Sequence, residues 1–325
     1  MLSAVRLQVI MEALQNVELP PFCGSTLRGA FLQALKEESC LSRTSCGEFC
    51  ALPTSCVYGA LCETPAPETA PKRVKSSRFA PHPYVLTPPK GGLYYSGELL
   101  TFQLTLFGGA PRKLPTVLKA LERMASTGIG KGRKSLRLFR VSTFPEATPV
   151  YKEGTIDLEG LQIKPLTWEP RESPSDQSLL EGQDLLLEMI TPLKLQKHGR
   201  LLTKIDAGEL VYAAADRLYL LSHCHGRPES APDAAEVAGK ARAAQIKVLE
   251  DDLRRVSFDR FSGRQNKKHR LDGLLGQIRL GPGFGPFFPL LQAASQVHLG
   301  NGTSFGLGAI ALQLVPASER TLTKK

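Results

Sequence analysis

The stretch VHLGNGTSFGLGAIAL, residues 297–312, places four glycines between a helix-like segment and a β-prone run near the end of the chain. The glycines fall at positions 300, 302, 306 and 308, with polar and aromatic residues between them. Glycine is used where φ must be positive or where a backbone must approach another group closely. Three interpretations follow: a phosphate cradle, a contact with a nucleic-acid backbone, or a tight packing corner between a helix and a strand.

The segments before this loop predict how the C-terminal half folds. Asp206, followed by Glu209 three residues later, is typical of the capped start of a helix. Hydrophobic spacing and turn signals predict the other elements. In order, we expect a strand at 185–195, a helix from Asp206, a helical insertion over about 233–256, a strand at 271–280, a helix from Pro286 to Gly300, the glycine-rich loop and a last strand.

The N-terminal half repeats this order of elements. Apolar residues recur at helical spacing from Leu27 to Leu35, and Ser25 is the expected N-cap of that helix. Pro115 is expected to open a second helix. In order, we expect a strand at about 5–11, the helix after Ser25, a strand–turn–strand unit at 93–108, the helix from Pro115, a glycine-rich turn at 126–135 and a strand at 136–142.

Both halves therefore predict the β-α-β-β-α-β unit of the ferredoxin-like fold. We expect an α+β protein with two tandem ferredoxin-like, or RRM-like, domains. Residues 1–165 would form the N-terminal domain with a cysteine-rich insertion, and residues 179–325 the C-terminal domain with its glycine-rich loop. A chain of 325 residues suits two domains. A Pro- and Ser-rich segment near 165–178 is the predicted linker.

The charge is basic and unevenly distributed. The 41 Lys and Arg residues outnumber the 31 Asp and Glu residues, giving a formal net charge of +10. The excess gathers in three stretches, at 72–78, 131–140 and 254–279. Concentrated positive charge suits a polyanion such as nucleic acid, although a merely solvated basic surface is the alternative. No apolar run approaches the ~20 residues of a membrane span, and a secretory signal is not evident, so we expect a cytoplasmic protein without a membrane partner.

Six of the seven cysteines lie between residues 23 and 62. Clustered thiols on short loops can bind zinc tetrahedrally, and four thiolates also suit an iron–sulfur cluster. We predict a structural zinc at Cys40, Cys46, Cys50 and Cys56, in preference to an iron–sulfur cluster. Free, partly buried thiols are the alternative, and no cofactor is expected to act in catalysis.

The segment GIGKGRKS, residues 128–135, is not a nucleotide-binding P-loop. The pattern G-x-x-x-x-G-K-[ST] is not satisfied, and the segment follows a helix rather than a strand. We interpret it as a loop that contacts RNA. Lys131, Arg133 and Lys134 would hold phosphates there, which positions a strand without reading its bases.

Seven segments together resemble the CRISPR repeat-processing endoribonucleases of the RAMP superfamily, and they occur in that family's order. They are LPPFCGSTLRGAFLQAL (19–35), CALPTSCVY (50–58), PHPYVLTPP (81–89), MASTGIGKGRKSLRLFRV (124–141), TPLKLQKHGRL (191–201), FDRFSGRQNKKHRLDGLLGQI (258–278) and HLGNGTSFGLG (298–308). The resemblance implies tandem ferredoxin-like domains that bind and cut repeat RNA without a catalytic metal. It also implies that the processed guide RNA and subunits of a CRISPR effector complex are partners.

Such cleavage uses attack by a ribose 2′-OH and leaves a 2′,3′-cyclic phosphate and a 5′-hydroxyl. The reaction needs a base, an acid and a cation for the additional negative charge. Many family members carry a histidine in or just after the first helix, and this chain has none there. We therefore name Lys36 and Arg43 as electrostatic candidates. His298 is a third catalytic candidate, with capping of the preceding helix as its alternative role.

The remaining predicted RNA contacts lie in three places. Arg28 falls in the first helix and would either pack or hold a phosphate. Asn301 and Thr303 lie in the glycine-rich loop, although the family usually has a basic residue where this chain has Asn301. The residues Arg264, Lys267, Lys268 and Arg270 form a basic segment that would hold the stem of an A-form RNA through its phosphates.

Two other functions remain open from the sequence. One is a catalytically inactive RNA-binding subunit of a CRISPR ribonucleoprotein complex, which the missing early histidine favours. The other is a metal-dependent nucleic-acid enzyme that uses the cysteine cluster.

Overall fold

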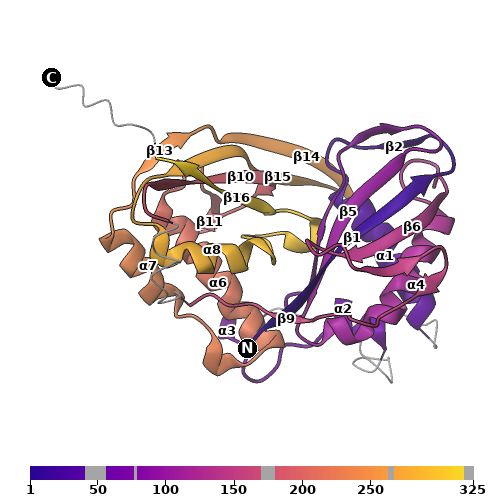
Figure 1. The fold of residues 1–325 in the computed structure, drawn as a ribbon, viewed down its shortest axis with the longest axis horizontal. Coiled ribbons are helices and arrows are strands. Elements are labelled where there is room, and N and C mark those ends of the chain that lie inside the picture. The colour runs from indigo at the N-terminus through magenta and orange to yellow at the C-terminus, as the bar shows by residue number, and fades with distance from the viewer. Residues whose placement is uncertain (41–55, 77–78, 170–179, 263–266, 318–325) are drawn as a thin grey trace.

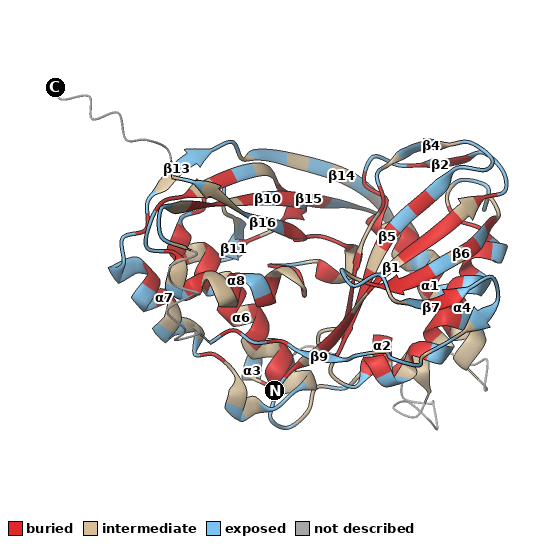
Figure 2. Cartoon of the chain, in the orientation of Figure 1, coloured by how far each residue is buried: buried red, intermediate tan, exposed pale blue. Residues whose placement is uncertain are grey.

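The computed structural model describes residues 1–40, 56–76, 79–169, 180–262 and 267–317. Figure 1 shows two lobes side by side, the N-terminal half in indigo to magenta and the C-terminal half in orange to yellow. Each lobe is a sheet with helices against it, and Figure 2 colours in red the buried residues of these strands and helices. None of the helices among these residues is long and apolar enough to cross a membrane.

The N-terminal lobe is built on a seven-stranded sheet. Its strands are β1 (Ser3–Ala13), β3 (Tyr84–Thr87), β5 (Leu99–Phe107), β6 (Leu136–Thr143), β7 (Pro149–Lys152), β8 (Thr155–Ile156) and β9 (Lys164–Pro165). The order is β3-β5-β1-β6-β7-β8, with β9 beside β1. Helices α1 (Gly24–Ser39) and α4 (Leu114–Thr127) complete the unit. The path β1-α1-β3-β5-α4-β6, with β1 and β5 central, is the ferredoxin-like topology that the sequence predicts.

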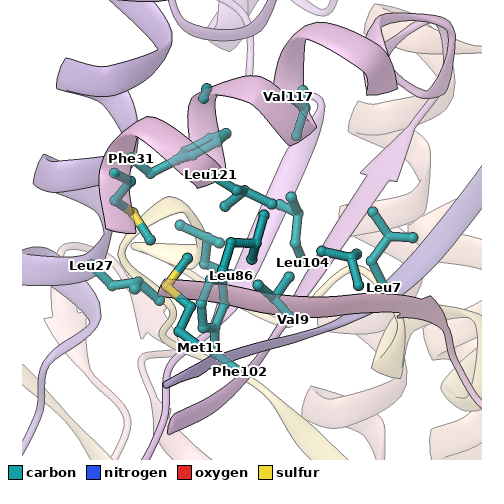
Figure 3. Packing of buried hydrophobic residues seen from close by; sticks show 14 of the residues in the cluster. Leu7, Val9, Met11, Leu27, Phe31, Leu86, Phe102, Leu104, Val117 and Leu121 are labelled. Carbon is teal, nitrogen blue, oxygen red and sulfur yellow. The ribbon is translucent and has the colours of Figure 1, made fainter. Parts of the chain in front are cut away.

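The core of this lobe follows from the period of its elements. Leu7, Val9 and Met11 alternate along β1 and point to one face, because successive strand residues face opposite sides of a sheet. They pack under Phe31 of α1 and Leu121 of α4, as Figure 3 shows. All five side chains are fully buried.

Smaller elements complete the lobe. These are β2 (Val17–Leu19), α2 (Val57–Cys62), α3 (Lys72–Lys75), β4 (Gly92–Tyr94) and the 3-10 helix η1 (Ala110–Lys113). Strands β2 and β4 pair with each other in a separate two-stranded sheet.

The C-terminal lobe repeats the topology. Its main strands are β10 (Gln183–Leu193), β13 (Val248–Asp251), β14 (Arg254–Ser262), β15 (Lys267–Leu280) and β16 (Ile310–Pro316), and its helices are α6 (Ala207–His225), α7 (Ala234–Ala243) and α8 (Phe288–Ser295). Short elements are β11 (Gln196–Lys197), β12 (Arg200–Leu201), η2 (Pro228–Ser230), η3 (Gly285–Phe287) and η4 (Thr303–Phe305). The order β13-β15-β10-β16 is again ferredoxin-like, and β14 pairs with β15.

Two local predictions are wrong. Helix α1 begins at Gly24 with Cys23 as its N-cap and no side-chain cap, so Ser25 lies inside the helix. The insertion at 233–256 is helical only as far as Ala243. The chain then pairs with β15 as β13 and β14, which satisfies backbone N–H and C=O groups along β15 that a helix would leave unpaired. By contrast, Asp206 caps α6 as predicted, accepting a hydrogen bond from the amide of Glu209 at 2.7 Å.

The two lobes share buried apolar surface. Leu2, Val85 and Phe107 of the N-terminal half belong to the same buried cluster as the helices of the C-terminal half. Strand β14 also extends across the top of the molecule toward the N-terminal lobe (Figure 1), where Phe258 meets Phe22 with ring centroids 5.5 Å apart. The predicted domain boundaries, with a linker largely within 170–179, lie partly outside the described residues and stay a prediction.

The first testable consequence concerns the N-terminal core. Leu121→Ala removes a fully buried side chain beneath α4, so we expect the free energy of unfolding to fall by about 2–5 kcal/mol. Leu93→Ala is the matched control because Leu93 is 51% exposed. Urea unfolding followed by circular dichroism measures both, and equal midpoints for the two variants would contradict this account of the core.

Candidate nucleic-acid interface

The glycine-rich loop that opens the sequence analysis is a packing corner between the lobes. Its four glycines all have positive φ, between 73° and 85°. A Cβ at Gly308 would lie 1.9 Å from the carbonyl oxygen of Leu299, which no side chain could tolerate. The loop contains η4, which contacts both α1 and β3 of the N-terminal lobe. The glycines therefore serve close backbone packing within the protein, as the third interpretation of the sequence held.

His298 is packed inside this corner and does not face RNA. It is 2% exposed and has a φ of 59°. Its Nδ1 lies 3.1 Å from the carbonyl oxygen of Leu307, and its Nε2 lies 3.0 Å from the hydroxyl of Thr87. Burial, with the nearby charge of Arg217, lowers the pKa of His298 to about 3, so the imidazole is neutral. Both ring nitrogens are engaged inside the protein, which does not favour a catalytic role for His298, and that role stays a prediction.

Arg28 ties the first helix to the glycine-rich loop. Its guanidinium lies over the ring of Phe305, 4.6 Å from the centroid. One of its terminal nitrogens donates to Nε2 of His82 at 3.2 Å. Burial and the charge of Arg28 lower the pKa of His82 to about 4, so this imidazole accepts the hydrogen bond as a neutral group. Arg28 thus packs at the junction of the lobes, and its predicted contact with RNA stays a prediction.

The second glycine-rich turn lies against the exposed side of α1. Gly128, Gly130 and Gly132 have positive φ, and so does Arg133. Arg133 donates to the Oε1 atom of Gln33 on α1 at 3.1 Å, which fixes the turn on the helix. Lys131 and Arg133 are exposed and Lys134 is partly exposed. The structure therefore presents the three predicted phosphate-binding residues together on one turn.

The predicted basic segment of the C-terminal lobe lies at the β14–β15 turn. Lys267 and Lys268 belong to β15, opposite Ser262 and Phe261 of β14. Arg270 is exposed, and Arg264 lies outside the described residues.

Asn301 and Thr303 border a cavity of the C-terminal lobe that reaches Pro81 of the N-terminal lobe. The cavity has a volume of about 640 Å³ and is walled by the glycine-rich loop, α6 and the β11–β12 hairpin. Asn301 is exposed and donates to Gln196 at 2.6 Å. Thr303 is only 8% exposed.

The three predicted catalytic residues do not come together in the part of the chain that is described. Lys36 lies eight residues after Arg28 on α1, a distance of about 12 Å along the helix axis. Its ammonium nitrogen is 5.9 Å from the centroid of the Tyr58 ring. His298 is buried at the other end of this region, and Arg43 falls outside the described residues. A catalytic role for Lys36 and Arg43 stays a prediction.

The cysteine cluster is only partly visible. Cys46 and Cys50 lie outside the described residues, whereas Cys40 and Cys56 stand at either side of that gap. No group of three or more metal-binding side chains occurs within the described ranges. The predicted zinc site stays a prediction.

Arg217 of α6 is a site residue that the sequence interpretation missed. It is 8% exposed, and its Nε donates to the carbonyl of Val297 at 3.1 Å. Its side chain forms part of the wall of the 640 Å³ cavity. The sequence does contain a signal for its burial. Arg217 falls three residues after Ala214 and seven after Leu210, which places it on the apolar face of the predicted helix.

Comparisons with known proteins agree with this fold. Residues 2–164 match the family model AF_1859_N, described as an N-terminal domain. Residues 187–310 match the model of the CRISPR-associated endoribonuclease Cas6. No curated protein matches the sequence. The C-terminal half of the chain therefore matches the Cas6 family, and the resemblance seen in the sequence is confirmed.

Solved structures share the fold at low identity. A Cas6 product complex is 17% identical with a TM-score of 0.53, covering 95% of this chain and 99% of that one. Cas6 of Thermus thermophilus is 15% identical with a TM-score of 0.51, at 96% and 99% coverage. A partial Cas6-RT-Cas1–Cas2 complex is 13% identical with a TM-score of 0.58 and covers 97% of this chain. The chain spans 46% of the length of the chain in that complex.

The buried imidazoles predict how stability depends on pH. Burial lowers the pKa of His298 to about 3 and that of His225 to about 4, whereas a free histidine has a pKa near 6.5. Below pH 6.5 these imidazoles bind protons in the unfolded chain, whereas in the folded chain they stay neutral until the pH reaches their lowered pKa values. The free energy of unfolding should therefore fall from pH 6.5 toward pH 4, by about 1.4 kcal/mol per pH unit for each such histidine.

Urea unfolding at pH 7.5 and pH 5 measures this dependence. In His298→Gln the free energy of unfolding should depend less on pH, and the decrease should equal the dependence expected from one buried histidine. His198→Gln, at an exposed position between β11 and β12, should keep the dependence of the wild type. An unchanged dependence in His298→Gln would show that the buried imidazole does not titrate as described.

Proposed function

We propose that this protein binds CRISPR repeat transcripts and cleaves them by attack of a ribose 2′-OH on the adjacent phosphate, without a catalytic metal. The match of residues 187–310 to the Cas6 endoribonuclease model carries this proposal. The basic turn at 128–134, fixed on α1 by Arg133 and Gln33, supports it as a surface for phosphates.

The chemistry would depend mainly on positioning and charge. Holding the 2′-OH in line with the scissile bond lowers the barrier, while the 2′-OH still has to lose its proton and the departing 5′-oxygen still has to gain one. Lys36 would stabilise the additional negative charge of the phosphorane. Lysine can also give or take a proton when it is desolvated, so Lys36 is a stronger candidate for proton transfer than Arg43, whose guanidinium stays protonated.

We propose RNA, both the transcript and the processed guide, as the principal partner. The chain resembles part of the longer chain in a solved Cas6-RT-Cas1–Cas2 complex, which favours a place in a CRISPR protein assembly. A cytoplasmic location stays a prediction.

A second function has its own support: an RNA-binding subunit that does not cut. Among the described residues near α1, the only histidine is His82, and its Nε2 already accepts a hydrogen bond from Arg28. His298 is buried with both ring nitrogens engaged. A protein with this arrangement would keep its RNA contacts while lacking an available imidazole for proton transfer.

A cleavage assay separates the two functions. In the presence of EDTA, we expect a single cut in the cognate repeat RNA and no cut in a copy with a 2′-deoxyribose at the cut site. Lys36→Ala should slow cleavage by about 10²-fold. Lys119→Ala, on the exposed side of α4, is the control and should cut normally. If the protein binds both RNAs tightly and cuts neither, even with added metal, the proposed nuclease function is wrong and the RNA-binding subunit is the function that remains.

We also propose a structural zinc at Cys40, Cys46, Cys50 and Cys56. The hydroxyl of Ser39 accepts a hydrogen bond from the amide of Tyr58 at 3.1 Å, so the chain returns close to its starting point across the gap that separates Cys40 from Cys56. Four thiolates of one zinc must converge in the same way.

Elemental analysis of the purified protein tests this site. We expect about one zinc per chain, lost in Cys46→Ser and kept in Cys224→Ser, whose cysteine lies far away in the sequence on α6. A wild-type protein without bound zinc would leave the cysteines as thiols. Retained cleavage in EDTA would also exclude the metal-dependent enzyme considered from the sequence.

A further inference from the structure

Arg217 is a buried positive charge that no carboxylate touches. Its side chain is nine-tenths buried on α6, and Nε is bonded to the carbonyl of Val297. Within the described residues, no carboxylate lies within ion-pair distance of its guanidinium; the adjacent Asp216 pairs instead with Arg73 of α3. Burying a charge without a directly bonded counter-ion lowers the free energy of unfolding. The guanidinium of Arg217 therefore destabilises the folded protein.

The carboxylates that line the larger cavity beside Arg217, Asp216 and Glu209, each pair with another cation, Arg73 and Lys197 respectively. His82, His225 and His298 are all near enough for the charge of Arg217 to lower their pKa values, together with burial. These three imidazoles are therefore neutral at physiological pH. Cys224 is also near, but burial raises the pKa of its thiol to about 11, so this group stays uncharged as well. Asp216 therefore compensates the charge of Arg217 only through space, because its carboxylate is bonded to Arg73.

Arg217 lies where two cavities meet. The 640 Å³ cavity and a second one of about 300 Å³ share Pro81, Arg217, Gly302 and Thr303 in their walls. The smaller cavity is also lined by Arg73, His82 and Ser304. Its walls therefore come from both lobes and include the guanidinium of Arg217 together with the hydroxyl side chains of Thr303 and Ser304.

We propose that Arg217, with Thr303 and Ser304, binds a phosphate group of RNA in the cavity between the lobes. The planar guanidinium can donate two parallel hydrogen bonds to a phosphate, and the hydroxyls can donate further ones. The choice of RNA as the source rests on the proposed function. The group would be an internal phosphodiester of the strand or the terminal phosphate of a cleaved product.

The anion site itself can be tested without RNA. Inorganic phosphate should raise the Tm of the wild-type protein above its value in chloride at equal ionic strength, because a ligand of the folded state stabilises it. The increase should vanish in Arg217→Met and persist in Arg200→Met, an exposed control on β12. A folded Arg217→Met protein, by far-UV circular dichroism, that responds to phosphate like the wild type would overturn the proposal.

RNA binding provides the second test. Arg217→Met should weaken binding about tenfold and reduce the slope of log K against log salt by about 0.7, the value for one contact with a single strand. Two milder variants replace Arg217→Met if that protein does not fold. Arg217→Lys keeps the positive charge, and Thr303→Val keeps the shape of the side chain. Each should weaken RNA binding less than Arg217→Met. RNA affinity unaffected by all three variants would contradict the site.

The two sources of the phosphate are distinguished by oligonucleotide ends. An equal loss for RNAs ending in a 3′-hydroxyl and in a 2′,3′-cyclic phosphate indicates an internal phosphodiester, and a loss confined to the cyclic-phosphate RNA indicates a product end. If RNA neither binds nor is cut while phosphate still acts through Arg217, the proposed function fails and the anion site stands. If RNA is cut normally and Arg217→Met changes neither readout, the function stands and the site fails.

Discussion

The close contact of two backbones at the junction of the lobes controls the rest of this structure. A Cβ at Gly24 would lie 2.0 Å from the carbonyl oxygen of Phe305, so the start of α1 and the loop around η4 can meet only through a glycine. This approach places Phe305 beneath the guanidinium of Arg28. It also turns Thr303 toward the space between the lobes. The glycine-rich loop therefore acts first as an internal joint, and its surface role depends on that packing.

The basic charge is divided between two environments. Lys131 and Arg133 are exposed on a turn beside α1, where water screens them and a polyanion can approach from solution. Arg217 lies buried among neutral imidazoles, where a charge interacts strongly with any anion that reaches it. A strand that contacts both would gain affinity at the turn and precise placement in the cavity. This division fits a protein that must hold RNA in a defined geometry rather than merely attract it.

The arrangement of the site explains why residue types alone were a poor guide to roles. His298 is titratable and follows a helix, yet its hydrogen bonds to Thr87 and Leu307 make it part of the core. Lys36 and His298 belong to segments that meet in space, but the length of α1 keeps Lys36 away from η4. The sequence pattern does not single out Arg217, because one arginine in an apolar helix is also typical of the edge of the buried face. Only the packing shows that it is enclosed.

Local patterns in the sequence determined the order of strands and helices, the two ferredoxin-like units and the resemblance to the family. Hydrophobic periodicity, the cap at Asp206 and the glycine turns depend on neighbours within a few residues, and such neighbours are known without the fold. The tertiary structure alone decided that β13 and β14 replace a helix, that His298 is enclosed and that Arg217 faces a cavity. Each of these depends on contacts between segments far apart in the chain, such as β14 with β15 or α6 with the glycine-rich loop. Burial and the pKa of a side chain are set by such contacts, and a single sequence does not record them.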